Sequence, residues 1–463
     1  MFDKKSTFIK RFQVEASSEE AFQWHAREGA IERLSPPWDP LKIIRRSGGI
    51  RSGAEVVMKL KMGPIPYTWR AEHTNYVENE LFRDEQRKGP FSKWIHTHRF
   101  AANDTGGCEI EDHIEYKLPF HFLSHLFAQP LILKKLGAIF DYRHRTTQQD
   151  LSLHNLNRNK EKLTFLISGA TGVIGSALVP FLTTGGHRVI KLVRNRATDH
   201  PDEISWDPMA GRLDLDPSEK IDAIIHLAGE NIGSQRWSET KKKKIIDSRN
   251  LGTALIAEKI SRLQQKPRVF LCASAIGFYG DRGEQMVTEQ DGAGDDFISD
   301  VCTQWEGSTD VAVKAGIRTA FLRIGVVLTP LGGALARLLL PFQLGMGTKI
   351  ASGKQYVSWI SMPDVLGSIY SLVFNEALSG PINIVSPKPC TNLELSKTLG
   401  KVLRRPVFFR IPEILIKSAF GQMGREVLLS STRVYPQVLL DSHYQFLYPD
   451  LEQWLLDTLG LGR

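Results

Sequence analysis

The pattern of apolar and polar residues divides the chain into two parts. Up to about residue 150, segments in which apolar and polar residues alternate are bounded by glycine and proline, which is typical of antiparallel strands with one face in water. We expect an α+β domain in which a curved sheet wraps around one long C-terminal helix and leaves a cavity between them. The expected strands are 55–62, 67–77, 94–100 and 108–117, and the expected helices are 18–31 and 122–150.

Beyond residue 162 the pattern changes, and short apolar strands alternate with helices. This order indicates an α/β fold with a parallel, doubly wound sheet of the Rossmann type. From about residue 331 the chain becomes helix-rich and irregular, and we expect this part to pack over the carboxyl edge of the sheet. The expected strands are 162–168, 188–193, 222–227, 268–273 and 319–324, and the expected helices are 173–184, 237–263 and 297–315.

Composition narrows the class of protein. The chain has 463 residues, 42% hydrophobic and 24% charged, which excludes a disordered or low-complexity protein and allows two or three domains. Its net charge, 59 − 51 = +8, is spread thinly, so we expect no nucleic-acid partner. There is no apolar run of about 18 residues and no secretory signal, so we expect no integral membrane association. Four cysteines without CxxC spacing predict reduced thiols and a cytoplasmic location.

A glycine-rich motif follows the first strand of the second part and opens a helix. Glycine at its first position permits a tight turn, the second lets backbone N–H groups approach a pyrophosphate, and the third lets helix and strand pack closely. The N-terminus of the helix favours the anion. The alternative is a plain glycine-rich turn. The predicted dinucleotide contacts in this motif are Gly169, Thr171, Gly172, Val173, Ile174 and Gly175.

The next two strand ends extend this predicted site. An NAD site places an acidic residue about 20 positions beyond the glycines, but here Arg194 stands 19 residues after Gly175. A guanidinium matches a 2′-phosphate, so NADP(H) is the predicted cofactor. The following strand ends in small residues that let a ribose lie close, although simple turn geometry would also explain them. We assign Leu227, Ala228, Gly229 and Glu230 to the cofactor site, together with Arg323 at the end of a later strand.

Several motifs in order, among them SGATGVIG, HLAGENI, SAIGFYGDRG and SWISMPDV, resemble the extended short-chain dehydrogenase/reductases. More narrowly, they resemble the atypical, YfcH-type branch of NAD(P)-dependent epimerase-like proteins. The resemblance covers residues 163–460. It implies an NADP-binding Rossmann domain over 163–375 and a C-terminal helical region, 376–463, that completes a substrate cleft and forms its lid.

Residues 1–153 resemble the START-like superfamily (SRPBCC), which includes polyketide cyclases and lipid-binding proteins. The segments that carry this resemblance are Pro36-Pro37-Trp38, residues 89–94 and His96-Thr-His98. This resemblance implies a helix-grip fold that binds a hydrophobic ligand. The polar, Asn-rich segment 154–162 is then a linker. In this order of domains the chain resembles bacterial proteins in which a START-like domain precedes a YfcH-type domain.

The resemblance also draws attention to the catalytic residues. Short-chain dehydrogenases use a Tyr and a Lys four residues later, but if Glu306 aligns with the glutamate that follows that pair, Ile298 and Cys302 occupy the two positions. Ser274 and Tyr279 are therefore the candidate catalytic residues. A strand-end hydroxyl that bonds backbone and a packing tyrosine are the alternatives. Glu230 is either a base or a cap, and Glu306 is expected to form a salt bridge on a helix face.

His96 and His98 lie two apart on one strand, but spacing suggests no third ligand, so we expect packing and no metal site. The predicted function is an NADP(H)-dependent epimerase or oxidoreductase acting on a small carbonyl or hydroxyl substrate. The alternative is a non-catalytic, NADP(H)-gated protein that binds a ligand or senses redox state. For the apolar segment 332–347 the sequence leaves three alternatives: it lines the substrate cleft, it forms the surface of a homodimer, or it packs in the core.

Overall fold

The computed structural model describes residues 6–63, 65–118, 123–194, 200–233 and 235–462. They form two compact units. One comprises Met1–Glu161 with Pro180–Gly186 and Asp457–Arg463, and the other comprises Lys162–Val179 with His187–Leu456. None of the described helices has an apolar stretch long enough to cross a bilayer. All four cysteines are buried and none forms a disulfide.

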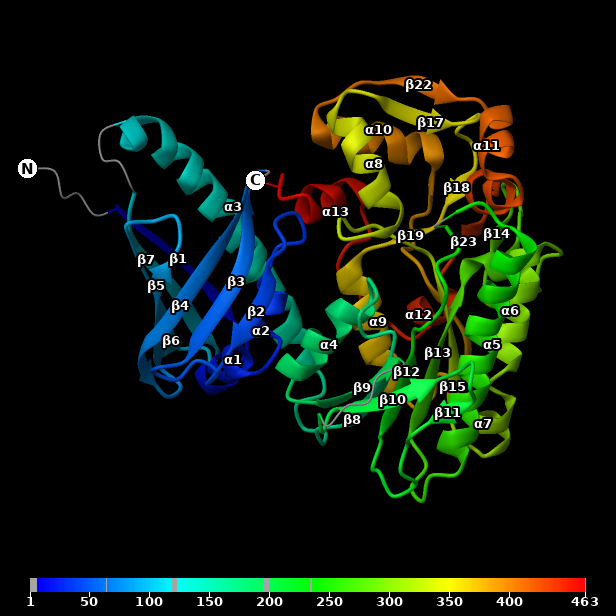
Figure 1. Cartoon of the computed structure of the whole chain (residues 1–463), viewed down its shortest axis with the longest axis horizontal. Coiled ribbons are helices and arrows are strands. Elements are labelled where there is room, and N and C mark those ends of the chain that lie inside the picture. Colours follow the sequence, from blue (N-terminus) through cyan, green and yellow to red (C-terminus); the bar gives the residue numbers. More distant parts are fainter. Residues whose placement is uncertain (1–5, 64, 119–122, 195–199, 234, 463) are drawn as a thin grey trace, which may run out of the picture. The chain divides into compact units, whose positions relative to one another are not determined.

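The first unit is a seven-stranded antiparallel sheet with a long helix (Figure 1). The strand order is β1-β7-β6-β5-β4-β3-β2, and α3 packs against β1. Side chains alternate along β7 between buried and half-buried, as the sequence pattern predicted. The strands are β1 Ser6–Val14, β2 Lys42–Arg46, β3 Glu55–Met62, β4 Ile65–Val77, β5 Leu81–Lys88, β6 Lys93–Ala102 and β7 Cys108–Lys117, and the helices are α1 Ser18–Ala26, α2 Ala30–Arg33 and α3 Leu123–Asn155.

Three features of this unit differ from the prediction. The strands β1, β2 and β5 were not expected; in β1 and β5, charged residues such as Lys10 and Asp84 on the inward face interrupt the alternation of apolar and polar positions. The expected helix 18–31 is two short helices, interrupted at Gly29, whose φ of +97° is unfavourable for other residues. Helix α3 continues to Asn155, into the segment expected to be a linker.

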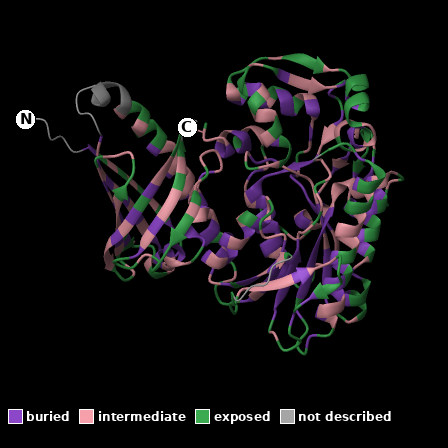
Figure 2. Cartoon of the chain, viewed as in Figure 1, coloured by how far each residue is buried: buried purple, intermediate pink, exposed green. Residues whose placement is uncertain are grey.

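The second unit contains an eight-stranded sheet in the order β11-β10-β9-β8-β12-β13-β15-β20. All neighbouring strands run parallel except β10 and β11. The central strand β12 is buried at every position, as Figure 2 shows, which is typical of a sheet covered on both faces. The strands are β8 Thr164–Ser168, β9 Arg188–Arg194, β10 Glu203–Asp207, β11 Arg212–Leu213, β12 Ala223–His226, β13 Val269–Ala275, β15 Thr319–Ile324 and β20 Gly380–Ile384.

The predicted Rossmann-type parallel sheet is confirmed, with additions at both edges. β20 pairs with β15, so the sheet includes residues beyond 375, where the sequence placed the end of this domain. The expected helix 297–315 is interrupted near Ser308 and forms two helices. The helices of this part are α4 Gly175–Thr184, α5 Glu239–Ser261, α6 Phe297–Gly307, α7 Asp310–Lys314 and α9 Met362–Phe374, with a 3-10 turn at Ile276–Tyr279.

The remaining chain forms small two-stranded pairs and short helices rather than a purely helical region. Helix α8 lies between β16 and β17, and it contacts both strands. The pairs are β14 (Met286–Val287) with β23 (Arg433–Val434), β16 (Val326–Val327) with β19 (Trp359–Ile360), β17 (Gly347–Ile350) with β22 (Val407–Ile411), and β18 (Tyr356–Val357) with β21 (Cys390–Thr391). The helices are α8 Gly333–Gln343, α10 Asn392–Leu403, α11 Glu413–Phe420, α12 Gln437–Asp441 and α13 Leu451–Thr458, with a π-helical turn at Gly424–Leu429.

Candidate cofactor and active site

The strand order reverses at β8, because β9 lies on one side of it and β12 on the other. Ligands of open α/β sheets bind at such a point, outside the carboxyl ends of the strands. The loop from Gly169 to Ile174 leaves β8 here and opens α4. The motif therefore occupies the position that the sequence predicted for it.

Glycine is required at the two ends of this loop. Gly169 has a φ of +72°, and a Cβ there would lie 2.8 Å from the backbone nitrogen of Ala228. A Cβ on Gly175 would lie 2.2 Å from the carbonyl oxygen of Gly169, a distance that no packing adjustment accommodates. Gly172 is different, because it is exposed and its Cβ would meet only that carbonyl, at 3.2 Å. The outer side of Gly172 is thus open to a ligand, which fits a pyrophosphate cradle.

The loop after β12 is bonded to the end of β8. The Oγ of Ser168 accepts the N–H groups of Leu227 at 3.2 Å and Ala228 at 3.3 Å, and it lies 2.5 Å from Nδ1 of His226. Burial, with a smaller effect of the Arg249 charge, lowers the pKa of His226 to about 3, so its imidazole is neutral and can accept the serine proton. These bonds hold the predicted ribose-contacting loop against the glycine loop.

Glu230, the last residue assigned to the loop after β12, forms an ion pair with Lys241. Its carboxylate lies 2.5 Å from Nζ of Lys241, and its N–H donates to Oγ of Ser248 at 3.0 Å. The hydrogen bond from Lys241 lowers the pKa of Glu230, and the charge of Arg194 contributes to the same shift. A carboxylate held ionised is a weak general base. Arg194 itself is exposed at the carboxyl end of β9, close enough for its charge to act on Glu230.

The two predicted catalytic residues belong to one buried network in which Glu306 accepts hydrogen bonds from Ser274 and Arg323. Ser274, at the end of β13, donates to Oε1 of Glu306 at 2.7 Å. Arg323 lies opposite Ser274 on β15 and binds the same carboxylate through two nitrogens, each at 2.9 Å. The Tyr279 hydroxyl donates to Oδ1 of Asn383 at 2.7 Å and accepts from Nη1 of Arg323 at 3.0 Å.

Burial controls the protonation of this network. It raises the pKa of Tyr279, although Arg323 opposes the shift, so the phenol keeps its proton. Burial would lower the pKa of Arg323, but hydrogen bonds from its guanidinium to Glu306 raise it overall. The ring of Phe278 lies 3.4 Å from Cζ of Arg323 and covers the guanidinium. Arg323, assigned to the cofactor from sequence, has its nitrogens engaged with Glu306 and Tyr279 in this structure.

Glu306 forms the salt bridge that was expected, but the pair is buried rather than on an exposed helix face. Ile298 and Cys302, on the same helix α6, belong to an apolar cluster with Trp237, Val301 and Met423. Burial raises the pKa of the Cys302 thiol to about 12. At neutral pH the Cys302 thiol therefore keeps its proton and the Ile298 side chain has none to exchange, so neither can replace the Tyr/Lys pair in proton transfer. Sequence reasoning missed Asn383, although an asparagine inside an apolar strand such as β20 is a signal for a buried polar contact.

Comparison with known proteins identifies the family. The pattern of the NAD-dependent epimerase/dehydratase family matches residues 165–302, and a domain of unknown function (DUF1731) matches residues 411–458. An epimerase family protein of Mycobacterium bovis is 36% identical over 280 residues, which is 60% of this chain and 92% of that protein. The chain belongs to the NAD-dependent epimerase/dehydratase family. The human epimerase family protein SDR39U1 is 35% identical over 289 residues, 62% of this chain and 96% of that protein.

Solved structures agree with this family. A crystal structure described as the nucleoside-diphosphate sugar epimerase from Corynebacterium glutamicum covers 98% of this epimerase family member and 90% of its own chain, with a TM-score of 0.79 and 30% identity. The human SDR39U1 structure (isoform 2) was solved with NADPH. It covers 64% of this chain and 99% of its own chain, with a TM-score of 0.59 and 32% identity. Relatives also occur in cattle and Arabidopsis thaliana, so the family is not confined to bacteria.

Proposed function

We propose that this chain is an NADP(H)-dependent oxidoreductase or epimerase that acts on a small carbonyl or hydroxyl substrate. The observation that carries the proposal is the glycine loop at the switch point, with Gly172 open on its outer side and Arg194 at the end of the neighbouring strand. When bound, NADP(H) would supply hydride chemistry at the nicotinamide. The residues that would hold it are those of the loops after β8 and β12, together with Arg194 at the end of β9.

Arg194 favours the phosphorylated form of the cofactor. It is exposed and positively charged at the strand end where an NAD site carries an acidic residue. Its planar guanidinium can bind a phosphate through two parallel hydrogen bonds. The human relative solved with NADPH supports the same choice.

For the chemical step, we assign Ser274 to the reacting oxygen and Tyr279 to a positioning role. Ser274 can turn away from Glu306 without leaving that carboxylate unpaired, because Arg323 still binds both of its oxygens. The freed hydroxyl could then donate to a substrate oxygen. Tyr279 is fully buried, and its proton is committed to Asn383. Its contribution is to hold Arg323 in the orientation that fixes Glu306 and Ser274.

A second candidate is a non-catalytic protein that binds NADP(H) and reports its redox state. It is favoured by Ile298 and Cys302, which place an apolar cluster where the resemblance predicts a tyrosine and a lysine. A protein of this kind would bind NADPH stoichiometrically and consume none. Turnover therefore separates the two candidates.

We also propose that the first unit is a START-like helix-grip domain for a hydrophobic ligand, and that the second belongs to the YfcH-type branch. The support for the helix-grip fold is a seven-stranded antiparallel sheet followed by the long helix α3. Three aromatic residues of this sheet, Trp69, Trp94 and Tyr116, belong to one hydrophobic cluster with Phe140 of α3. Such a domain would bring an apolar ligand to the same chain as the nicotinamide cofactor.

The test uses NADPH carrying deuterium at C4 of the nicotinamide, in two separate preparations labelled on either face. The full chain is incubated with each preparation and a metabolite extract, or with a panel of nucleoside-diphosphate sugars, the class named for the Corynebacterium neighbour. Protein-dependent deuterium in one product identifies a reductase and its substrate. Loss of that label in Ser274→Ala supports the assigned role, whereas full turnover in this variant contradicts it. If the protein binds NADPH but transfers no label and interconverts no sugar nucleotide, the non-catalytic candidate is supported.

A further inference from the structure

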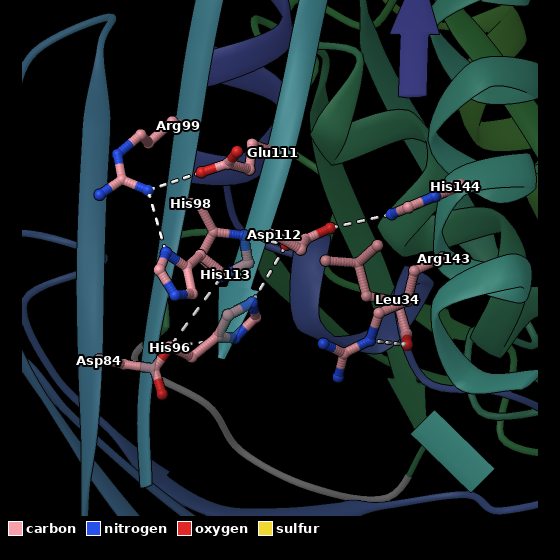
Figure 3. A network of polar contacts seen from close by, with 10 residues as sticks. All are labelled: Leu34, Asp84, His96, His98, Arg99, Glu111, Asp112, His113, Arg143 and His144. Carbon is pink, nitrogen blue, oxygen red and sulfur yellow. Dashed lines mark hydrogen bonds and ion pairs between the residues drawn. The ribbon is translucent and has the colours of Figure 1, made fainter. Parts of the chain in front are cut away.

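A buried group of acidic and imidazole side chains lies in the first unit, separate from the dinucleotide loops. It is built on three neighbouring strands, with Asp84 on β5, His96 and His98 on β6, and Asp112 on β7 (Figure 3). Strand register brings them together, because Asp84 pairs directly with His96 and His98 pairs directly with Asp112. Side chains two apart on a strand share a face, so both imidazoles project to the same side as the carboxylates.

One nitrogen of each imidazole faces Asp84. Nδ1 of His96 lies 3.6 Å and Nε2 of His98 lies 3.9 Å from Oδ1 of Asp84. These separations are too long for hydrogen bonds. Around a tetrahedral ion with bonds of about 2.0–2.1 Å, neighbouring ligand atoms are about 3.4 Å apart. The ligand atoms of the three residues lie within 4.8 Å of one another, so a small inward movement would place all of them on one ion.

The other nitrogen of each imidazole faces Asp112. Nε2 of His96 lies 3.1 Å and Nδ1 of His98 lies 2.8 Å from Oδ1 of this carboxylate, and Nε2 of His144 on α3 lies 2.9 Å from Oδ2. A carboxylate behind a ligating histidine fixes the ring and its tautomer, and metal sites commonly contain such partners. Here the Asp112 carboxylate is hydrogen-bonded to His96 and lies within ion-pair distance of His98. Hydrogen bonds to Asp112 do not explain why a second carboxylate, that of Asp84, lies on the other side of the two imidazoles.

The electrostatics of the cluster agree with this arrangement. His96 and His98 are both buried, and a metal ion binds the neutral form of an imidazole. Among the described residues, no hydrogen-bond donor reaches the carboxylate of Asp84, whose side chain is 18% exposed. The guanidinium of Arg143 on α3 is close enough for its charge to act on both Asp84 and Asp112. A largely buried carboxylate that is ionised and has no donor is costly, and a bound cation would offset that cost.

We propose that Asp84, His96 and His98 bind one divalent transition-metal ion, with Asp112 orienting the two histidines. Two imidazoles and a carboxylate form a donor set that suits zinc and does not suit magnesium or calcium. Three protein ligands leave a fourth position for water or for a ligand oxygen. The sequence predicted no metal site, because Asp84 is 12 residues from His96 and comes close to it only through the pairing of β5 with β6.

The test is metal binding by the purified full chain. The protein is stripped with a chelator and then titrated with Zn²⁺ by calorimetry and with Co²⁺ by visible absorption. One equivalent of Zn²⁺ and the d–d bands of a low-coordinate Co²⁺ site without thiolate charge transfer are expected. The absence of thiolate bands excludes the four cysteines as ligands. A folded chain that binds no stoichiometric Zn²⁺ overturns the proposal.

Variants locate the site. Asp84→Asn and His98→Gln remove a ligand and should weaken Zn²⁺ binding at least about 100-fold, whereas Asp112→Asn should weaken it about 10- to 100-fold. The matched control is His113→Gln on β7, whose imidazole faces Arg99 rather than the cluster. Circular dichroism of each metal-free variant establishes folding, and if one ligand variant does not fold, the other carries the comparison. Equal affinity in wild type and in a folded ligand variant would contradict the proposal.

Discussion

The carboxylate of Glu306 and the guanidinium of Arg323 form a two-pronged ion pair, in which Nε–Oε1 and Nη2–Oε2 are both 2.9 Å. Both residues are buried, so bulk water stabilises neither charge. The pair joins α6 to the carboxyl end of β15, and Ser274 joins β13 to the same carboxylate. The position of Ser274 therefore depends on an electrostatic contact between two other elements.

Replacement of one partner tests this dependence. Glu306→Gln should lower the free energy of unfolding by about 3–5 kcal/mol, because it leaves Arg323 buried without an opposing charge. The control is Asp310→Asn on α7, which breaks an exposed contact of 4.0 Å with Lys314 and should change stability by less than about 1 kcal/mol. Urea denaturation measures both variants. Similar small losses in the two would mean that the buried pair is unimportant.

The close approach of Gly175 to Gly169 predicts a second result. In Gly175→Ala, a Cβ 2.2 Å from the Gly169 carbonyl must displace the loop, so we expect a loss of about 1–3 kcal/mol in stability and at least tenfold weaker NADPH binding. Gly292→Ala is a matched control, since its Cβ would meet no atom within 4 Å. NADPH fluorescence titration and thermal denaturation measure the two effects. Unchanged NADPH binding in Gly175→Ala would contradict the loop's assigned role.

Arg194 is expected to determine the preference between NADPH and NADH. Arg194→Gln should weaken NADPH binding about tenfold, the equivalent of one charge-assisted contact, and leave NADH binding nearly unchanged. Arg188→Gln, at the other end of the same strand, breaks ion pairs with Asp202 and Glu219 and should alter neither affinity. Titration of each variant with both cofactors decides the question. Parallel losses for NADPH and NADH would rule out a contact with the 2′-phosphate.

His25 predicts that acid destabilises the first unit. Burial lowers the pKa of His25 from 6.5 to about 4. Between these values the unfolded chain binds a proton that the folded chain does not, so stability falls as the pH decreases from 6.5 to 4. The loss from this group is at most about 3 kcal/mol. Protection of residues 6–117 from proteolysis, read by mass spectrometry across this pH range, should fall less steeply in His25→Gln, and an identical pH dependence would refute the assignment.

Local patterns were enough to predict much of the fold. The glycine loop and the buried strand β8 are adjacent in sequence, so their relation to α4 follows from a few residues. Strands β1 and β20 were missed for opposite reasons. β1 carries charged residues such as Lys10 and Arg11 beside its apolar ones, and β20 is a short strand that begins with Gly380-Pro381. Their assignment depends on pairing with β7 and β15, which is a long-range property.

The candidate sites were predictable only in part for the same reason. Ser274 and Tyr279 could be singled out because they lie at the end of β13 and in the turn after it, but Asn383, the partner of Tyr279, lies 104 residues away from it. The pairing of Ser274 with Arg323 depends on the register between β13 and β15. Asp84 and Asp112 likewise reach the two histidines of β6 through pairing on either side. A single sequence fixes the composition of each strand but not the register that joins one strand to the next.

The four cysteines lie in four different elements: β7, β13, α6 and β21. Burial raises the pKa of Cys108 to about 11 and those of Cys302 and Cys390 to about 12, and it also raises the pKa of Cys272. A thiol enclosed in this way reacts with an alkylating reagent only when its surroundings open, so its labelling rate reports that opening. The four native thiols thus report local opening in four parts of the structure. Mass spectrometry of the alkylated peptides can measure the opening rate around each cysteine without an introduced probe.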